Sequence, residues 1–153
     1  NSLVGTVATS RVGSGGITKL SNGNVVVASP LWGTGTLTSV GAVTWINGTT
    51  GLTGAVSAAN SLVGSNAGDG VGLGYTTSPR VAGVNALGNG NYVVVSPNWG
   101  NGTTTKLGAI TWRDGSAANG GTGAAVSSTN SVVGTFANDQ LGAGAFVVLT
   151  NNN

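Results

Sequence analysis

Side chains that could do acid–base or nucleophilic chemistry are scarce in this sequence of 153 residues. It contains no His, Cys or Glu, and its only carboxylate side chains are Asp69, Asp114 and Asp139. The absence of His and Cys excludes Ser-His-Asp and Cys-His nucleophilic systems, disulfides and thiolate metal sites. We therefore predict that the protein is not an enzyme, with no catalytic residue, no metal site and no cofactor.

Two of the carboxylates occupy equivalent places in the sequence. Asp69 ends the phrase "AGD" and Asp139 ends the phrase "AND". Because they belong to different copies of a repeat, we do not expect them to meet as the paired carboxylates of a glycosidase. We predict instead that both are turn residues whose side chains bond the local backbone. Ser10 holds the equivalent place near the start of the chain, which argues against a shared metal ligand.

Tryptophan is the residue type here that best suits ligand binding. Trp32 and Trp99 each follow a Ser-Pro pair and precede a stretch rich in Gly, Thr and Asn. Loops on a rigid repeat scaffold carry function, so we predict that both rings are exposed and stack on a sugar. Neutral polar neighbours would supply hydrogen bonds, which gives a predicted ligand-binding set of Trp32, Trp99, Asn98 and Asn101.

The alternative interpretation is that the tryptophans are packing residues, because large rings fill the space between sheets. Trp45 and Trp112 lie inside the β-branched phrases "AVTWI" and "AITWR", and this strand context favours packing for both.

The overall composition narrows the class of protein. Charged residues make up 5% of the chain, against roughly 25% in a typical globular protein, and there are 29 Gly. The formal net charge is +2, and the cations are dispersed along the chain at Arg11, Lys19, Arg80, Lys106 and Arg113. Because nucleic-acid binding needs clustered cations, we predict no nucleic-acid partner. No apolar run approaches the roughly 20 residues of a membrane helix, so we predict no membrane span.

The chain is an internal repeat. Residues 16–48 align without gaps on residues 83–115, and the phrase "NSLVG" occurs at 1–5 and 60–64 and returns as "NSVVG" at 130–134. The basic unit is therefore about 60 residues, with insertions in loops. We predict the end of a preceding repeat at 1–15, a complete unit at 16–64, an insertion loop at 65–82, a second complete unit at 83–134, and the start of a third at 135–153.

Each unit carries signals for four short strands. The phrases "ITKL" and "NVVVAS" flank Asn22-Gly23, a strong hairpin signal that Asn89-Gly90 repeats. Pro30 and Pro97 follow the valine runs, where a strand should end. We predict an all-β fold, a repeat array of four-stranded antiparallel β-propeller-like blades, with a β-solenoid as the alternative.

These phrases resemble FG-GAP repeats, the blades of integrin-α-type β-propellers. The segment "GSNAGDGVG" resembles the lead-in of such a repeat, "VVVASP" and "VVVSP" resemble its Gly-Ala-Pro strand, and "GAVTW" and "GAITW" resemble its Gly-Ala-Val strand. The chain is also similar to Gly- and Asn-rich repeats of large bacterial haemagglutinin-like surface proteins. The calcium-binding loop of FG-GAP repeats is reduced here to "SNGN" and "GNGN" without a carboxylate, so we do not expect calcium at these positions.

The resemblance implies a non-catalytic extracellular or cell-surface protein of adhesin type, which binds a glycan or a protein partner through its loops. The alternative is a structural protein whose chains self-assemble edge to edge into a filament or surface coat. Two units cannot close a propeller, so we expect self-association or neighbouring repeats. In a monomer, strands near "SLVG" at residue 2 and "FVVL" at residue 146 would be unpaired edges.

Overall fold

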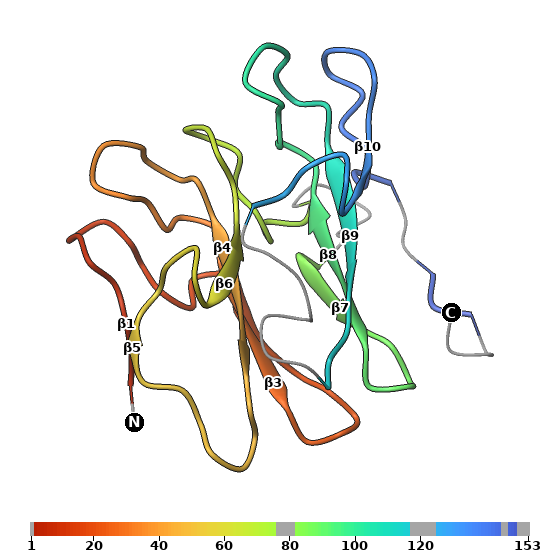
Figure 1. Cartoon of the computed structure of the whole chain (residues 1–153). Helices are drawn as coiled ribbons and strands as arrows, with labels where there is room; N and C mark the ends of the chain where they lie inside the picture. The colour runs from red at the N-terminus through yellow and green to blue at the C-terminus, as the bar shows by residue number, and fades with distance from the viewer. Residues whose placement is uncertain (1, 76–81, 117–124, 145–146, 150–153) are drawn as a thin grey trace.

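The computed structural model describes residues 2–75, 82–116, 125–144 and 147–149, and within them it is all β-structure without a helix (Figure 1). Sheet I runs in the order β2-β3-β4-β6 and sheet II in the order β7-β8-β9-β10, and every pairing within them is antiparallel. A separate parallel pair joins β1 to β5. The strands are β1 (Leu3–Val4), β2 (Gly16–Lys19), β3 (Val25–Ser29), β4 (Ala42–Ile46), β5 (Gly54–Ala55), β6 (Ser61–Val63), β7 (Val84–Ala86), β8 (Tyr92–Ser96), β9 (Ala109–Arg113) and β10 (Val132–Val133).

The predicted all-β class and the four-stranded antiparallel sheets are confirmed. The turn at Asn22-Gly23 forms as expected, because Leu20 N donates to Asn24 O at 2.9 Å and Gly23 has a φ of +88°. This left-handed conformation favours glycine, which explains why the hairpin residue is Gly in both repeats.

The Ser-Pro pairs end their strands, as predicted: β3 ends at Ser29 and β8 at Ser96. Both serines are fully buried, and each hydroxyl accepts a hydrogen bond from a backbone N–H. Gly13 N donates to Ser29 Oγ at 3.0 Å, and Gly72 N donates to Ser96 Oγ at 3.2 Å. The serine thus attaches a preceding stretch of chain to the end of its sheet.

Those stretches belong to three equivalent segments, residues 2–15, 61–74 and 131–144, which we call the linking segments. Each begins with the "SLVG" or "SVVG" phrase. The first ends directly before the unit at residue 16, whereas residues 75–82 separate the second from the unit that starts at residue 83. The second linking segment includes β6 of sheet I and then crosses to sheet II. Sheets I and II are therefore joined by a segment that bonds to both.

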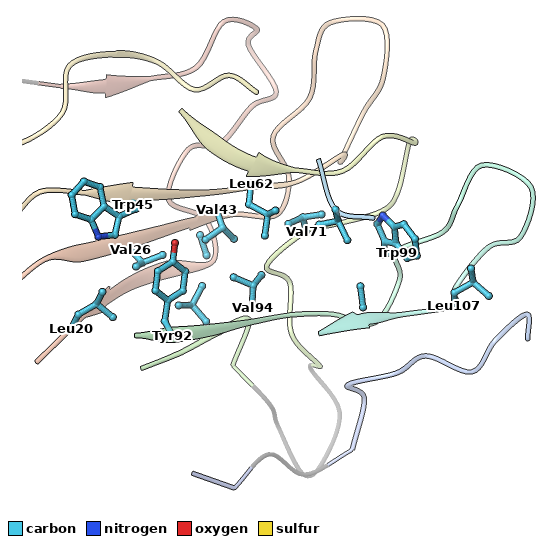
Figure 2. Packing of buried hydrophobic residues seen from close by; sticks show 14 residues of the cluster. Leu20, Val26, Val43, Trp45, Leu62, Val71, Tyr92, Val94, Trp99 and Leu107 are labelled. Atoms are coloured by element: carbon cyan, nitrogen blue, oxygen red, sulfur yellow. The ribbon is translucent and has the colours of Figure 1, made fainter. Parts of the chain in front are cut away.

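The main core lies between the two sheets (Figure 2). Side chains alternate along a strand, so Val26, Val43 and Trp45 of sheet I share one face, and Tyr92 and Val94 of sheet II share the face opposite. The Trp45 ring reaches across this layer, and its Nε1 donates to Gly115 O at 2.9 Å. Packing and a hydrogen bond therefore act together at the same contact.

Close backbone approach explains the glycine that opens the "GAVTW" and "GAITW" phrases. Gly41 pairs in parallel with Val71, and Gly108 pairs in parallel with Leu141. A Cβ at Gly41 would lie 2.0 Å from Val71 N, and one at Gly108 would lie 2.1 Å from Leu141 N. No side chain fits at either place, so glycine is required wherever a linking segment crosses the start of the third strand of a sheet.

One expectation about the chain ends is wrong. The "SLVG" strand is not an unpaired edge, because β1 pairs in parallel with β5 and Val56 N donates to Val4 O at 3.0 Å. Residues 147–149 of the expected "FVVL" strand are exposed and form no strand. Residues 76–81 of the predicted insertion loop, and residues 145–146 and 150–153 of the predicted third repeat, lie outside the described residues.

The two equivalent strand tryptophans give a matched test of the contact between the sheets. Trp45 is 8% exposed and Trp112 is 54% exposed. We expect Trp45→Phe to lower the free energy of unfolding by about 1–2 kcal/mol, since it loses ring volume and the bond to Gly115 O. Trp112→Phe should change it by less than about 0.5 kcal/mol. Urea unfolding at low protein concentration measures both, and equal losses would contradict this account.

Candidate functional site

The loop that follows β8, residues 97–107, contains three of the four predicted binding residues. Trp99 N donates to Ser96 O at 3.1 Å, and Gly108 N donates to Trp99 O at 3.0 Å, so the loop leaves and returns at the same end of sheet II. The fourth predicted residue, Trp32, lies in the equivalent loop after β3, where Trp32 N donates to Ser29 O at 2.9 Å. The structure therefore brings Trp99, Asn98 and Asn101 together but places Trp32 in the other repeat.

The predicted exposure of Trp32 and Trp99 is wrong. Trp99 is 4% exposed and belongs to the main core with Leu107 and Val126. Trp32 is 5% exposed and packs with Val40 and others in a separate cluster. A ring that stacks on a sugar must present a face to solvent, and at this burial neither ring does. The loop folds each indole back over the end of its own sheet, which a position after a strand end does not reveal.

Both of these indoles carry an unsatisfied donor. Trp32 Nε1 and Trp99 Nε1 are buried and have no hydrogen-bond partner among the described residues. A buried N–H without a partner costs roughly 1–3 kcal/mol, so a water or a ligand oxygen that reached it would be stabilised. The same donor recurs in both repeats, while the strand residue Trp45 has its own partner at Gly115 O.

Two pockets open on either side of the 97–107 loop and share Gly100 as a wall. The first has a volume of about 400 Å³ and is lined by Trp99 and Asn101, together with the chain around Val126 and Val133. The second has a volume of about 380 Å³ and is lined by Asn98 and Lys106, together with residues 66–69 of the second linking segment. The predicted residues Asn98 and Asn101 thus line different pockets.

Asn101 also shapes the loop itself. Its Oδ1 accepts hydrogen bonds from Thr104 N at 2.8 Å and from Thr103 N at 3.1 Å. Asn47 closes a similar turn in a different loop, the one that follows β4 in the first repeat, where it accepts from Thr49 N and Thr50 N at 2.9 Å each. Both Asn-Gly-Thr phrases are therefore turns closed by an Asn side chain.

Asp69 connects the linking segment to this loop. Its Oδ2 accepts from Ser65 N and Asn66 N at 2.9 Å each, which confirms the predicted bonding to local backbone. Its Oδ1 also accepts from Gly100 N at 3.1 Å, and this second role was missed because no local pattern signals it. Asn66 Nδ2 adds a bond to Gly100 O at 3.1 Å. Both the N–H and the C=O of Gly100, in the wall between the two pockets, are thus hydrogen-bonded to the second linking segment.

Asp139 repeats only the local half of this arrangement. Its Oδ2 accepts from Thr135 N and Phe136 N at 2.8 Å each, and these backbone bonds lower the pKa of the Asp139 carboxyl. Asp114 also has a lowered pKa, because Ser116 donates to it from both its hydroxyl and its backbone N–H. Neither carboxylate belongs to a group of three or more His, Cys, Asp or Glu side chains that could hold a metal ion, and no such group occurs in the described parts of the chain.

The fold and loops define an all-β protein built from two copies of one repeat. The chain belongs to the family described as "Repeat of unknown function (DUF5650)", which matches residues 19–73 and again residues 86–143. No curated protein and no solved structure matched the chain. Within the described residues no helix is long and apolar enough to cross a membrane. The resemblance to FG-GAP repeats remains a hypothesis beside this family assignment.

We expect substitution of the two equivalent aspartates to lower the free energy of unfolding by different amounts. Asp69→Asn places an NH₂ group among three backbone N–H donors in a buried site, and we expect a loss of about 2 kcal/mol in the free energy of unfolding. Asp139→Asn should cost clearly less, because Asp139 is exposed and bonds only its own turn. Chemical denaturation of the two variants tests this, and a larger loss for Asp139→Asn would refute the assignment of Asp69 as the connection to the loop.

The lowered carboxyl pKa values predict a direction of pH dependence. A folded-state pKa below the unfolded value stabilises the fold at pH above the unfolded value, and this contribution is lost as pH falls through the folded value. NMR titration should therefore find Asp114 and Asp139 titrating below the ordinary Asp range. Ser116→Ala removes the largest cause at Asp114, so that pKa should rise towards its usual value while Asp139 stays unchanged. A rise at both sites would contradict the local origin of the shift.

Proposed function

We propose that the chain is a non-catalytic binding module of adhesin type, which holds a glycan or a polar protein surface against the 97–107 loop. The observation that carries this proposal is the pair of pockets that meet at Gly100. Their volumes, about 400 and 380 Å³, fall in the range of small-molecule sites. Both are large enough for a sugar residue.

The chemistry of the lining favours a neutral, hydroxyl-rich ligand. Side chains of Asn, Ser and Thr dominate the polar lining, and these both donate and accept hydrogen bonds. The charged side chains of the second pocket are Lys106 and Asp69. Asp69 already accepts three backbone N–H bonds and has little capacity left for a cation. A strongly charged ligand would therefore find a single counter-charge, at Lys106.

The predicted binding residues take revised roles in this proposal. Trp99 forms a buried wall of the first pocket, and Asn98 lines the second. Asn101 holds the loop in shape and lines the first pocket. Trp32 is not part of the site, because it packs in the core of the first repeat.

A propeller-like arrangement and a location outside the cell or on its surface belong to the same proposal. The first strands of the two sheets, β2 and β7, contact each other, and Ser21 Oγ beside β2 donates to Gly88 O beside β7 at 3.0 Å. Blades of a propeller are likewise packed around their first strands. Edge-to-edge assembly into a filament has less support, because Val63 O on the outer edge of sheet I already accepts from Val126 N at 2.9 Å.

Glycan-array binding tests the proposal. We expect the chain to bind neutral glycans, and Asn98→Ala or Asn101→Ala to reduce binding about tenfold through lost hydrogen bonds and a relaxed loop. Asn47→Ala removes the other Asn-Gly-Thr turn, which lies in the loop after β4 of the first repeat, and is the control that should keep full binding. Absence of binding by the parent chain to any glycan or protein surface tested would overturn the proposal, as would equal losses in Asn101→Ala and Asn47→Ala.

A further inference from the structure

The three linking segments share one local structure. Each contains a turn in which the residue at the Asp position donates its N–H three residues back: Ser10 to Val7 O at 3.0 Å, Asp69 to Asn66 O at 3.2 Å, and Asp139 to Phe136 O at 3.1 Å. The glycine that ends the "LVG" or "VVG" phrase lies tightly against this turn each time, at Gly5, Gly64 and Gly134. The three segments are therefore interchangeable in backbone shape.

The first and second segments dock on the following sheet in the same way. In the first repeat Val56 N donates to Val4 O at 3.0 Å, and in the second Val126 N donates to Val63 O at 2.9 Å. Gly13 and Gly72 likewise bond the serines at the ends of β3 and β8. Residues 2–15 thus occupy on sheet I the place that residues 61–74 occupy on sheet II.

The first segment fits its place less well than the second. Ser10 stands where Asp69 stands, and Ser10 Oγ is buried without a hydrogen-bond partner among the described residues. The N–H of Gly33, the equivalent of Gly100, therefore does not donate to Ser10 as Gly100 N donates to Asp69. A segment carrying Asp at this position would satisfy the site on sheet I that Ser10 leaves unfilled.

The third linking segment and sheet II carry the residues that would form the other side of such a contact, and these residues are exposed to solvent. Val132 is 68% exposed, whereas its equivalent Leu62 is 1% exposed in the core between the sheets. Trp112 is exposed where Trp45 is buried. On sheet I, Ile17 is 71% exposed where its equivalent Val84 on sheet II is 5% exposed. The exposed face of sheet II therefore carries the positions that sheet I buries in the internal interface. The exposed face of sheet I carries the positions that sheet II buries there.

We propose that a second copy of this chain docks head to tail, with residues 131–144 of one copy replacing residues 2–15 on sheet I of the other. Asp139 then accepts from Gly33 N of the second copy, as Asp69 does from Gly100 N within one chain. Trp112 Nε1 donates to Gly48 O, as Trp45 does to Gly115 O. The contact is heterologous, so it builds a ring or an open chain according to the angle between copies.

The exchange replaces the hydrogen bonds that it breaks, and it buries additional apolar surface. Backbone bonds that residues 2–15 make to Gly54 N and Val56 N are replaced by equivalent bonds from the incoming segment. The gains are a satisfied acceptor at Asp139 and the burial of Trp112, Val132 and Ile17. Displacement of one segment by an equivalent segment of another copy resembles domain swapping, which is a low-cost route to association. Residues 133–135 of the incoming segment also line the first pocket, so the contact shares that wall with the candidate site, but it does not depend on the proposed binding function.

Engineered disulfides test the exchange without background, since the chain has no Cys. Val4 pairs directly with Ala55, so oxidised Val4→Cys/Ala55→Cys should lock residues 2–15 in place. Sedimentation velocity should then show the native chain associating with rising concentration, the oxidised lock remaining monomeric, and the reduced lock associating again. A native chain that stays monomeric at every concentration overturns the proposal, and so does association that oxidation leaves unchanged.

A mixing experiment fixes the register. Val63 pairs in parallel with Ala125, so the equivalent contact between copies joins Val133 to Ala55. A Val133→Cys chain mixed with an Ala55→Cys chain should give a mixed disulfide dimer at least about tenfold faster than Val133→Cys mixed with Thr103→Cys, an exposed control. Equal rates would show collision only and would refute this register.

Two single substitutions separate the role of the aspartate from that of folding. Asp139→Ser should weaken association about tenfold, because the incoming segment then lacks its charged acceptor. Ser10→Asp should also weaken association, but by strengthening the resident segment, and should therefore raise the Tm of the monomer. Thermal melts accompany both measurements. Unchanged association in both variants would contradict the exchange.

Discussion

The carbonyl oxygen of Gly115 is the contact on which the arrangement of the two sheets depends. It accepts from Trp45 Nε1, Asn22 Nδ2 and Asn24 Nδ2, each at 2.9 Å, so three donors of the first repeat meet one acceptor of the second. Asn24 Oδ1 in turn accepts from Gly48 N, which ties the hairpin to its own sheet. The "NGN" phrase is therefore both a turn and a clamp, because its first Asn and its last Asn bond the neighbouring repeat.

Repetition of sequence does not give repetition of environment. Trp45 and Trp112 hold equivalent positions in the two repeats, yet one is buried against sheet II and the other faces solvent. The same holds for Leu62 and Val132, and for Val84 and Ile17. An interface between repeats has two different sides, so each repeat carries one side toward its predecessor and the other toward its successor. The burial of these positions therefore depends on whether a neighbouring repeat packs against them, and not on the residue type.

The predictable part of this fold is the part set by nearby residues. Asn-Gly turns, strand ends at Ser-Pro, and Asp turns involve residues within four positions of each other, and all three were predicted correctly from the sequence. The bond from Gly100 N to Asp69 and the parallel pair of β1 with β5 join residues at least 30 positions apart, and the buried loop tryptophans pack in clusters drawn from several strands and loops. Such contacts depend on where the linking segments cross, and no spacing within a single unit reveals it.

The candidate pockets follow from the same geometry, because each forms where a linking segment meets the loop of the next sheet. The second pocket joins residues 66–69 to the loop with Asn98 and Lys106. The first repeat has an equivalent hollow, about 340 Å³, lined by Thr9 and Arg11 of the first linking segment with Leu31 and Ser39. Leu31 replaces Asn98 and Ser39 replaces Lys106, so the cation moves from the loop to the linking segment while the loop becomes more apolar. Repeats that share one scaffold can therefore differ in ligand chemistry, because the side chains at some of the lining positions differ between the repeats.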